Sequence, residues 1–79
     1  MRLIVEVADA TLKTDLTRKA SIYAHHDIPE YWVVDVNARV IHQMWAPEDS
    51  VYAERREKAF GAPITAVSIE GLAVETAGI

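Results

Sequence analysis

The order of apolar and polar positions divides the first half of this 79-residue chain into two strands and a helix. The apolar run of residues 3–7 predicts a strand covered on both faces of a sheet. After a loop over residues 8–13, a Thr-Asp start and apolar helical spacing predict a helix over residues 14–26, which Pro29 stops. The Tyr, Trp and Val of residues 30–35 predict a second strand. If both strands share a sheet, the unit is a right-handed parallel crossover.

The second half of the chain alternates as antiparallel hairpins do. Residues 39–45 predict a strand that returns along the previous one, and residues 47–50 predict a turn. Residues 51–60 alternate and carry five charges, as an exposed edge strand would. Residues 64–69 predict a last strand, and we expect the apolar tail 71–79 to pack back on the sheet. The predicted fold is therefore α+β (α/β-like): a mixed sheet with a strand–helix–strand crossover followed by antiparallel hairpins.

The length fits one small domain over residues 1–79. Because a strand covered on both faces needs neighbours on both sides, we expect one of two arrangements. Either the chain is the C-terminal part of a longer domain, truncated at its N-terminus, or a second copy completes the sheet in a homo-oligomer. The second arrangement suits a small chain without cysteine, which has no disulfide to stabilise it.

Composition and charge narrow the class of protein further. No apolar run approaches the roughly 18 residues that span a bilayer, so we expect no membrane association and a cytoplasmic location. The net charge of −4 argues against a dedicated nucleic-acid-binding protein with a basic face. It does not exclude a nuclease, because metal-binding acids themselves lower the charge.

One acid inside the first apolar run, Glu6, needs a partner, because an ionised carboxylate is costly to bury alone. The following helix offers Asp15, Lys19 and Tyr23, spaced four residues apart so that they form a single row. Such a set could bind magnesium or manganese and position water for phosphodiester cleavage, with the ammonium stabilising negative charge. On the residues alone, a structural ion pair between Glu6 and Lys19 is the favoured alternative.

The same residues resemble a known family. The run 3–12, then Asp15, Lys19 and Tyr23, and finally the segment Ile-Pro-Glu-Tyr-Trp-Val-Val-Asp of residues 28–35, are similar to the C-terminal part of the putative restriction endonuclease family. That family, formerly a domain of unknown function, has the PD-(D/E)XK nuclease core. The resemblance extends more weakly to the segment near residues 69–72. It implies a restriction-endonuclease-like core and a DNA endonuclease.

The resemblance also implies roles for individual residues. Glu6 matches the second metal-ligating acid, and the Val7 carbonyl would be a further ligand of Mg²⁺ or Mn²⁺. Lys19 matches the helix lysine that stabilises charge and orients water as the base, while Asp15 and Tyr23 match supporting positions of the helix motif. The family's first acid lies on a strand upstream of the second one. We therefore expect this chain to lack that ligand. Two hypotheses follow: an endonuclease-type phosphodiesterase domain acting on DNA, or a non-catalytic oligomerising remnant that serves as an interaction module.

Other residues carry weaker signals. The His25-His26 pair with Glu30 could bind zinc, although a histidine at a helix end more often just favours the helix dipole. Trp32 and Trp45 could stack on bases, although cross-strand packing in the core is the favoured interpretation.

Charged residues outside the helix row can be interpreted in two ways as well. Arg39, Arg55, Arg56 and Lys58 could contact a phosphate backbone, but the intervening glutamates favour a solvated charged face. Asp9 could reach a metal held near the first strand, and we favour a turn role instead.

Overall fold

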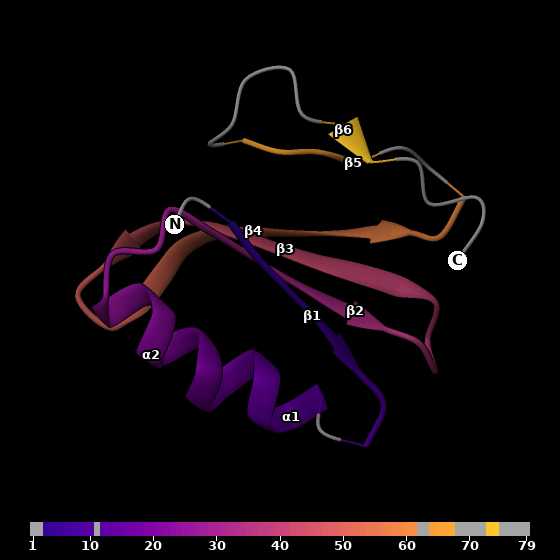
Figure 1. The fold of residues 1–79 in the computed structure, drawn as a ribbon, viewed down its shortest axis with the longest axis horizontal. Coiled ribbons are helices and arrows are strands. Elements are labelled where there is room, and N and C mark those ends of the chain that lie inside the picture. Colours follow the sequence, from indigo (N-terminus) through magenta and orange to yellow (C-terminus); the bar gives the residue numbers. More distant parts are fainter. Residues whose placement is uncertain (1–2, 11, 62–63, 68–72, 75–79) are drawn as a thin grey trace.

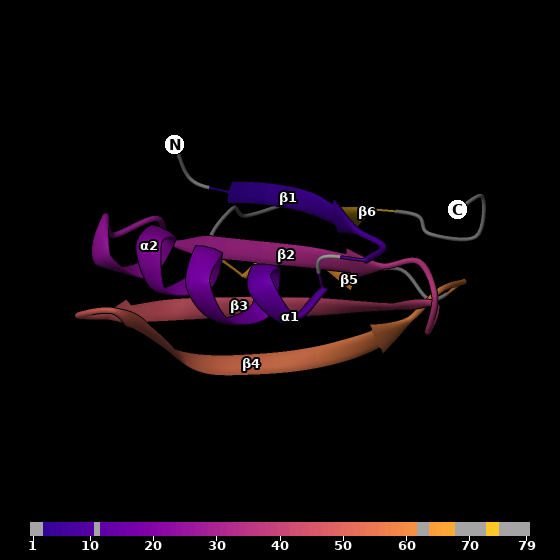
Figure 2. The ribbon, with the colours of Figure 1, turned by 90° about the horizontal axis from the view of Figure 1, so that it is seen from below.

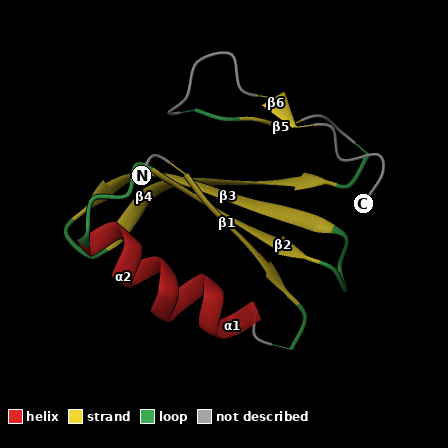
Figure 3. Ribbon diagram, viewed as in Figure 1, coloured by secondary structure: helices red, strands yellow, loops and turns green. Residues whose placement is uncertain are grey.

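The structure, a computed structural model, describes residues 3–10, 12–61, 64–67 and 73–74. These residues form strands, one continuous helical rod and short turns (Figure 3). The rod contains two α-helical segments around a π-helical one, η1. The elements, in chain order, are β1 Leu3–Ala8, α1 Leu12–Thr14, η1 Asp15–Lys19, α2 Ala20–His25, β2 Glu30–Asp35, β3 Val40–Glu48, β4 Val51–Ala59, β5 Ile64–Thr65 and β6 Ala73–Val74.

The first four strands make one mixed sheet in the order β1-β2-β3-β4. The pair β1–β2 is parallel, and β2–β3 and β3–β4 are antiparallel. The helical rod lies on one face of this sheet and the pair β5–β6 lies beyond the other (Figures 1 and 2). The predicted mixed α+β sheet is therefore confirmed. The hand of the β1–β2 connection and the restriction-endonuclease-like core stay predictions.

Two apolar clusters occupy the spaces between these layers. Every residue of β2 is buried, and successive side chains of a strand point to opposite faces. Tyr31 and Val33 pack toward the helix, whereas Trp32 and Val34 pack toward Ile64 of the β5 segment. The central strand β2 thus has a covered face on each side, which explains its almost unbroken apolar run.

The first strand differs from its prediction. Val5 is 51% exposed and Val7 is 69% exposed, so β1 is not covered on both faces. Only the alternate residues, such as Ile4 and Ala8, pack toward the helix. Among the described strands β1 pairs only with β2, which makes it an edge of the sheet. Apolar composition alone cannot separate a covered strand from an edge strand, and here the prediction was wrong.

The helix begins and ends at other residues than the predicted range of 14–26. It starts at Leu12 and not at Thr14, whose side chain makes no capping hydrogen bond. At the other end the Asp27 amide donates to the Ala24 carbonyl at 3.0 Å, and the Ile28 amide donates to the Tyr23 carbonyl at 3.0 Å. This is a Schellman closure with Asp27 at φ 57°, in the left-handed position usually taken by glycine.

The hairpin between β3 and β4 has a shorter turn than predicted. Its strands run to Glu48 and start again at Val51, so Pro47 pairs with Tyr52 inside the ladder. The fourth strand is exposed and highly charged, as the sequence predicts for an edge strand.

The end of the chain confirms little of its prediction. The last predicted strand is observed only over β5. Residues 68–69 lie outside the described part. Of the predicted tail, only Ala73–Val74 is described, and it pairs with β5. No described helix is long and apolar enough to cross a membrane.

Candidate active site

The Glu6 carboxylate lies between the edge strand and the helix. Strand alternation turns Glu6 to the same side as Ile4 and Ala8, which pack against the helix. One carboxylate oxygen, Oε2, accepts a hydrogen bond from Lys19 Nζ at 2.7 Å, and the other, Oε1, accepts one from the Tyr23 hydroxyl at 2.6 Å. The predicted partnership between the strand acid and the helix lysine is therefore confirmed, whichever role it serves.

Lys19 connects two carboxylates. Its Nζ also lies 3.1 Å from Oδ1 of Asp15, whose side chain is only 1% exposed. Both residues belong to the π-helical segment η1, where i→i+5 hydrogen bonding makes a wider turn than in an α-helix. Because such turns are frequent at functional sites, the segment that carries the predicted site residues is also the irregular part of the helix. The predicted row of Asp15, Lys19 and Tyr23 thus forms on the side of the helix that faces Glu6.

A residue that the sequence did not single out, Tyr31, completes the buried side of this cluster. Its hydroxyl donates to the backbone carbonyl of Asp15 at 3.1 Å. Its ring packs edge-on against Tyr23, with centroids 4.9 Å apart. Tyr52 stacks behind Tyr31 at 6.4 Å. The strand pattern shows that Tyr31 is buried, but only the parallel pairing of β1 and β2 reveals that it faces the helix row.

The ionisation of the cluster follows from these contacts. Hydrogen bonds from Lys19 and then Tyr23 hold the pKa of the Glu6 carboxyl below its usual range. The same bond to Glu6, followed by that to Asp15, raises the pKa of the Lys19 ammonium above its usual range. The bond to Glu6 also raises the pKa of Tyr23. At neutral pH, Glu6 is therefore an anion and Lys19 a cation.

The donor atoms around Glu6 suit a hard divalent cation in part. The carboxylate is 23% exposed, and each of its oxygens accepts one described hydrogen bond, which leaves further lone pairs. The Ala8 carbonyl accepts from the Val36 amide of the neighbouring chain segment, so the Val7 carbonyl, one residue earlier, faces the open edge. Within the described ranges no group of three or more His, Cys, Asp or Glu side chains could hold a metal. Two oxygen donors are a partial ligand set, of the size that Mg²⁺ accepts because it usually keeps several waters.

The predicted zinc alternative is contradicted. His25 and His26 are exposed at the end of the helix, with ring centroids 5.6 Å apart. Glu30 is fully buried and its carboxylate is occupied elsewhere: Oε2 accepts from Trp32 Nε1 and Gln43 Nε2, both at 2.6 Å. The sequence neighbours therefore do not converge on a metal.

The remaining candidates have structural contacts. Asp9 accepts a hydrogen bond from the Asn37 side chain at 2.9 Å, which joins two loops at the end of the sheet. Trp32 is buried in the second apolar cluster, in agreement with the favoured core interpretation. Trp45 lies under the Arg56 guanidinium, 5.4 Å from its ring centroid. Arg56 also donates to the Gln43 side chain at 2.6 Å, so it is more than a solvated surface charge.

The fold and this cluster define an α+β domain with an acid–lysine–tyrosine group between an edge strand and a helix. A family model described as Uma2, putative restriction endonuclease, matches residues 1–77. No curated protein and no solved structure matches the chain. The chain belongs to the Uma2 family, which confirms the family suggested by its sequence. Membership implies a PD-(D/E)XK core and a nuclease-like domain.

Proposed function

We propose that this chain contributes the acid–lysine part of a DNA endonuclease active site, which hydrolyses phosphodiester bonds. The observation that carries the proposal is the Lys19 ammonium, held between the carboxylates of Glu6 and Asp15. The side chain of Lys19 is 40% exposed, so the cation is accessible from solvent while two acids fix its position. A fixed cation at a partly open edge suits an anionic substrate and the charge that develops on it.

Each described side chain of the cluster has a separate role in the proposed reaction. An ammonium has three N–H donors, and Glu6 and Asp15 each engage Nζ of Lys19, which leaves capacity for a phosphate oxygen or an attacking water. The raised pKa of Lys19 keeps this group protonated, which supports charge stabilisation and disfavours a role as general base. Tyr23 holds the other Glu6 oxygen and so orients the carboxylate. The buried carboxylate of Asp15 positions Lys19 through its contact with Nζ.

A divalent cation fits the proposal as a cofactor held by the Glu6 carboxylate and the Val7 carbonyl. When bound, Mg²⁺ or Mn²⁺ would supply charge neutralisation and polarisation of the phosphate. Because the described residues offer only these two donors, we expect weak cation binding without DNA and tighter binding with it.

A plasmid-nicking assay with magnesium tests the proposal. Glu6→Gln and Lys19→Ala should each lower the nicking rate by about a hundredfold or more, as the loss of a transition-state contact does. Lys13→Ala is the matched control, because Lys13 is an exposed lysine of the same helix outside the cluster, and it should nick normally. Equal nicking by all four proteins would contradict the assignment, and so would the absence of nicking by the unmodified chain.

A second candidate function, assembly into a homo-oligomer, is supported by a different observation. The exposed valines 5 and 7 lie on an edge strand that has a described neighbour on one side only. Such an edge offers unpaired backbone groups beside an apolar surface, which favours pairing with another chain. The charged edge strand β4 lacks this combination.

Sedimentation distinguishes this second function. We expect the chain to sediment as a dimer or larger species and Val7→Lys to shift it toward the monomer. Val51→Lys, at a similarly exposed valine of β4, should leave the sedimentation unchanged. A folded monomer at micromolar concentration would contradict assembly into a homo-oligomer.

A further inference from the structure

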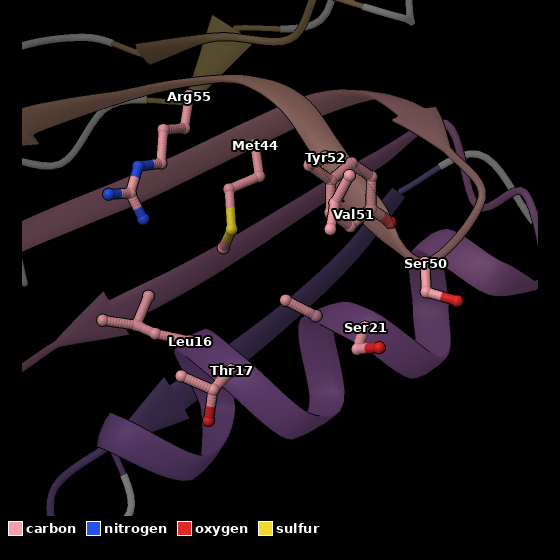
Figure 4. A pocket seen from close by; sticks show the side chains of 9 residues that line it. Leu16, Thr17, Ser21, Met44, Ser50, Val51, Tyr52 and Arg55 are labelled. Atoms are coloured by element: carbon pink, nitrogen blue, oxygen red, sulfur yellow. The ribbon is translucent and has the colours of Figure 1, made fainter.

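A groove separate from the Glu6–Lys19 cluster runs between the helix and the β3–β4 hairpin. It consists of two adjoining hollows, of about 360 and 320 Å³, which share Leu16, Met44 and Arg55. Figure 4 shows the first of them: the helix residues Leu16, Thr17 and Ser21 face Met44, Tyr52 and Arg55 of the hairpin across the space. Hollows of this size hold small organic ligands.

A residue that lines the second hollow, His42, has a buried ring nitrogen, Nε2, with no hydrogen bond among the described residues. The other ring nitrogen, Nδ1, lies 3.3 Å from the Glu57 carboxylate on the neighbouring strand. A carboxylate beside Nδ1 favours a proton on that nitrogen, and a neutral ring protonated there has Nε2 as an acceptor. Buried polar atoms normally have partners, and this one lacks a donor.

Arg55 supplies a cation to the same hollow. It pairs with Met44 across the hairpin, next to the pair of His42 and Glu57, and all four residues line the hollow. Its side chain makes no ion pair or hydrogen bond within the part of the chain that the structure describes, and in Figure 4 its guanidinium extends over the groove above Leu16. A guanidinium presents a planar fork of donors that matches the oxygens of a phosphate or carboxylate.

Arg55 and His42 together indicate which class of ligand the hollow would bind. Arg55 favours anionic oxygens, whereas the His42 acceptor favours a ligand that also carries a proton on oxygen. A phosphate monoester offers both around its second pKa of about 6, where the singly protonated and the doubly charged forms coexist. Arg55 is the arginine whose side chain lies on this face, because the Arg56 guanidinium lies on the other face of the sheet, where it contacts Gln43 and Thr65.

We propose that the groove binds a phosphate monoester, with its phosphate between Arg55 and His42 and its apolar body along Leu16 and Met44. The apolar floor continues into the first hollow toward Tyr52, which provides room for an aromatic or similarly flat group. This site lies on the hairpin side of the helix and uses none of the residues Glu6, Lys19 or Tyr23. Its occupancy is therefore independent of the proposed nuclease activity.

Titration of the isotope-labelled full chain with phenyl phosphate, followed by amide chemical shifts, tests the site. We expect saturable shifts at Leu16, Met44 and Arg55. Arg55→Gln should weaken binding by about tenfold or more, as loss of a charge-assisted contact does. The matched control Arg39→Gln removes an exposed arginine from a turn outside the groove and should change binding by less than about twofold.

His42→Phe tests the acceptor and should also weaken binding, while benzoate should bind less tightly than phenyl phosphate. Oligonucleotides with and without a terminal phosphate identify the source of the monoester: a preference for the phosphorylated one indicates a nucleic-acid end, and equal weak binding indicates a free small molecule. Shifts without saturation, shifts away from the groove, equal weakening in Arg39→Gln, or benzoate binding as tight as phenyl phosphate would each overturn the proposal.

Discussion

At the scale of single residues, the Glu6 carboxylate makes acid stability a measurable consequence of the cluster. Because Lys19 and Tyr23 lower its pKa in the folded chain, Glu6 contributes stability above its usual pKa of 4.5. That contribution is lost as the pH falls through the lowered value. Glu6→Gln should therefore cost about 1 kcal/mol at neutral pH, and the difference from the unmodified chain should shrink below pH 4.5.

Urea unfolding of both proteins from neutral to acidic pH measures this difference. Glu48→Gln, at an exposed glutamate near a turn, is the control and should track the unmodified chain at every pH. A Glu6→Gln difference that stays constant with pH would contradict the lowered pKa.

The three tyrosines predict a matching effect at alkaline pH. Burial raises the pKa of Tyr52 to about 12, burial also raises that of Tyr31, and the bond to Glu6 raises that of Tyr23. A raised pKa means that the stabilising contribution is complete below the usual value of 10 and is lost as the pH rises through the folded value. In a tyrosinate absorbance titration, we expect no tyrosine to ionise at its usual pH before the chain unfolds.

Tyr52→Phe refines this alkaline prediction. It removes the hydroxyl that donates to the Ile28 carbonyl at 2.8 Å, so it should destabilise the chain by about 1 kcal/mol. It should also remove one step of the titration. A step near the usual tyrosine pKa in the folded chain would show that the hydroxyls are more solvated than the structure indicates.

At the scale of elements, the helix end holds an aspartate where glycine is favourable. Asp27 adopts φ 57°, and a left-handed conformation costs an L-residue roughly 1–2 kcal/mol, somewhat less for aspartate. Glycine avoids this cost but is more flexible when unfolded, so we expect Asp27→Gly to stabilise the chain by about 0.5–1 kcal/mol. The urea midpoint measures it. Ala38→Gly, in an exposed turn without a positive φ, should give no gain, and an unchanged midpoint for Asp27→Gly would contradict the argument.

The buried carboxylate of Glu30 is one of several groups that attach the β5 segment to the sheet, besides the side chains of Gln43 and Arg56 that donate to the Thr65 carbonyl. Besides its contacts with Trp32 and Gln43, this carboxylate accepts from the Val67 amide at 2.9 Å. Glu30→Gln would turn an amide N–H₂ toward at least one of these donors. We expect a loss of about 1–3 kcal/mol, as for other buried groups left without a partner, and faster amide exchange at Val67. Exchange at Val67 equal to that of the unmodified chain would contradict a protective role of the Glu30 carboxylate at this amide.

At the scale of the whole molecule, the sequence predicts what short-range spacing determines. The strand–helix–strand order lies within residues 3–35, and the contacts of Glu6 with the helix row lie within residues 6–23, where helical periodicity and strand alternation suffice. The family could also be inferred, because its characteristic residues occur in this local unit and in the strand that follows.

Features that depend on distant parts of the chain could not be inferred in the same way. The apolar Val5 and Val7 suggested a covered strand because composition does not reveal the order of strands in a sheet. The predicted turn was longer than the observed one, and the sequence pattern did not define the register between β3 and β4. The sequence therefore could not predict that His42 and Arg55 lie close together. Glu30, which shortly follows the histidine pair in the sequence, proved to contact a residue 37 positions away.

The open side of β1 has a consequence for how the metal shell could be completed. Neighbouring strands of a sheet lie about 4.8 Å apart, and side chains directly opposite each other point to the same face. A strand joining β1 at its free side would therefore carry one side chain beside Glu6, turned toward the helix. If that side chain were an aspartate or a glutamate, a second carboxylate would stand next to the first without any rearrangement of the helix row. Under the proposed function, the position of Glu6 on an outermost strand would make the cation affinity of the site depend on the strand that pairs there.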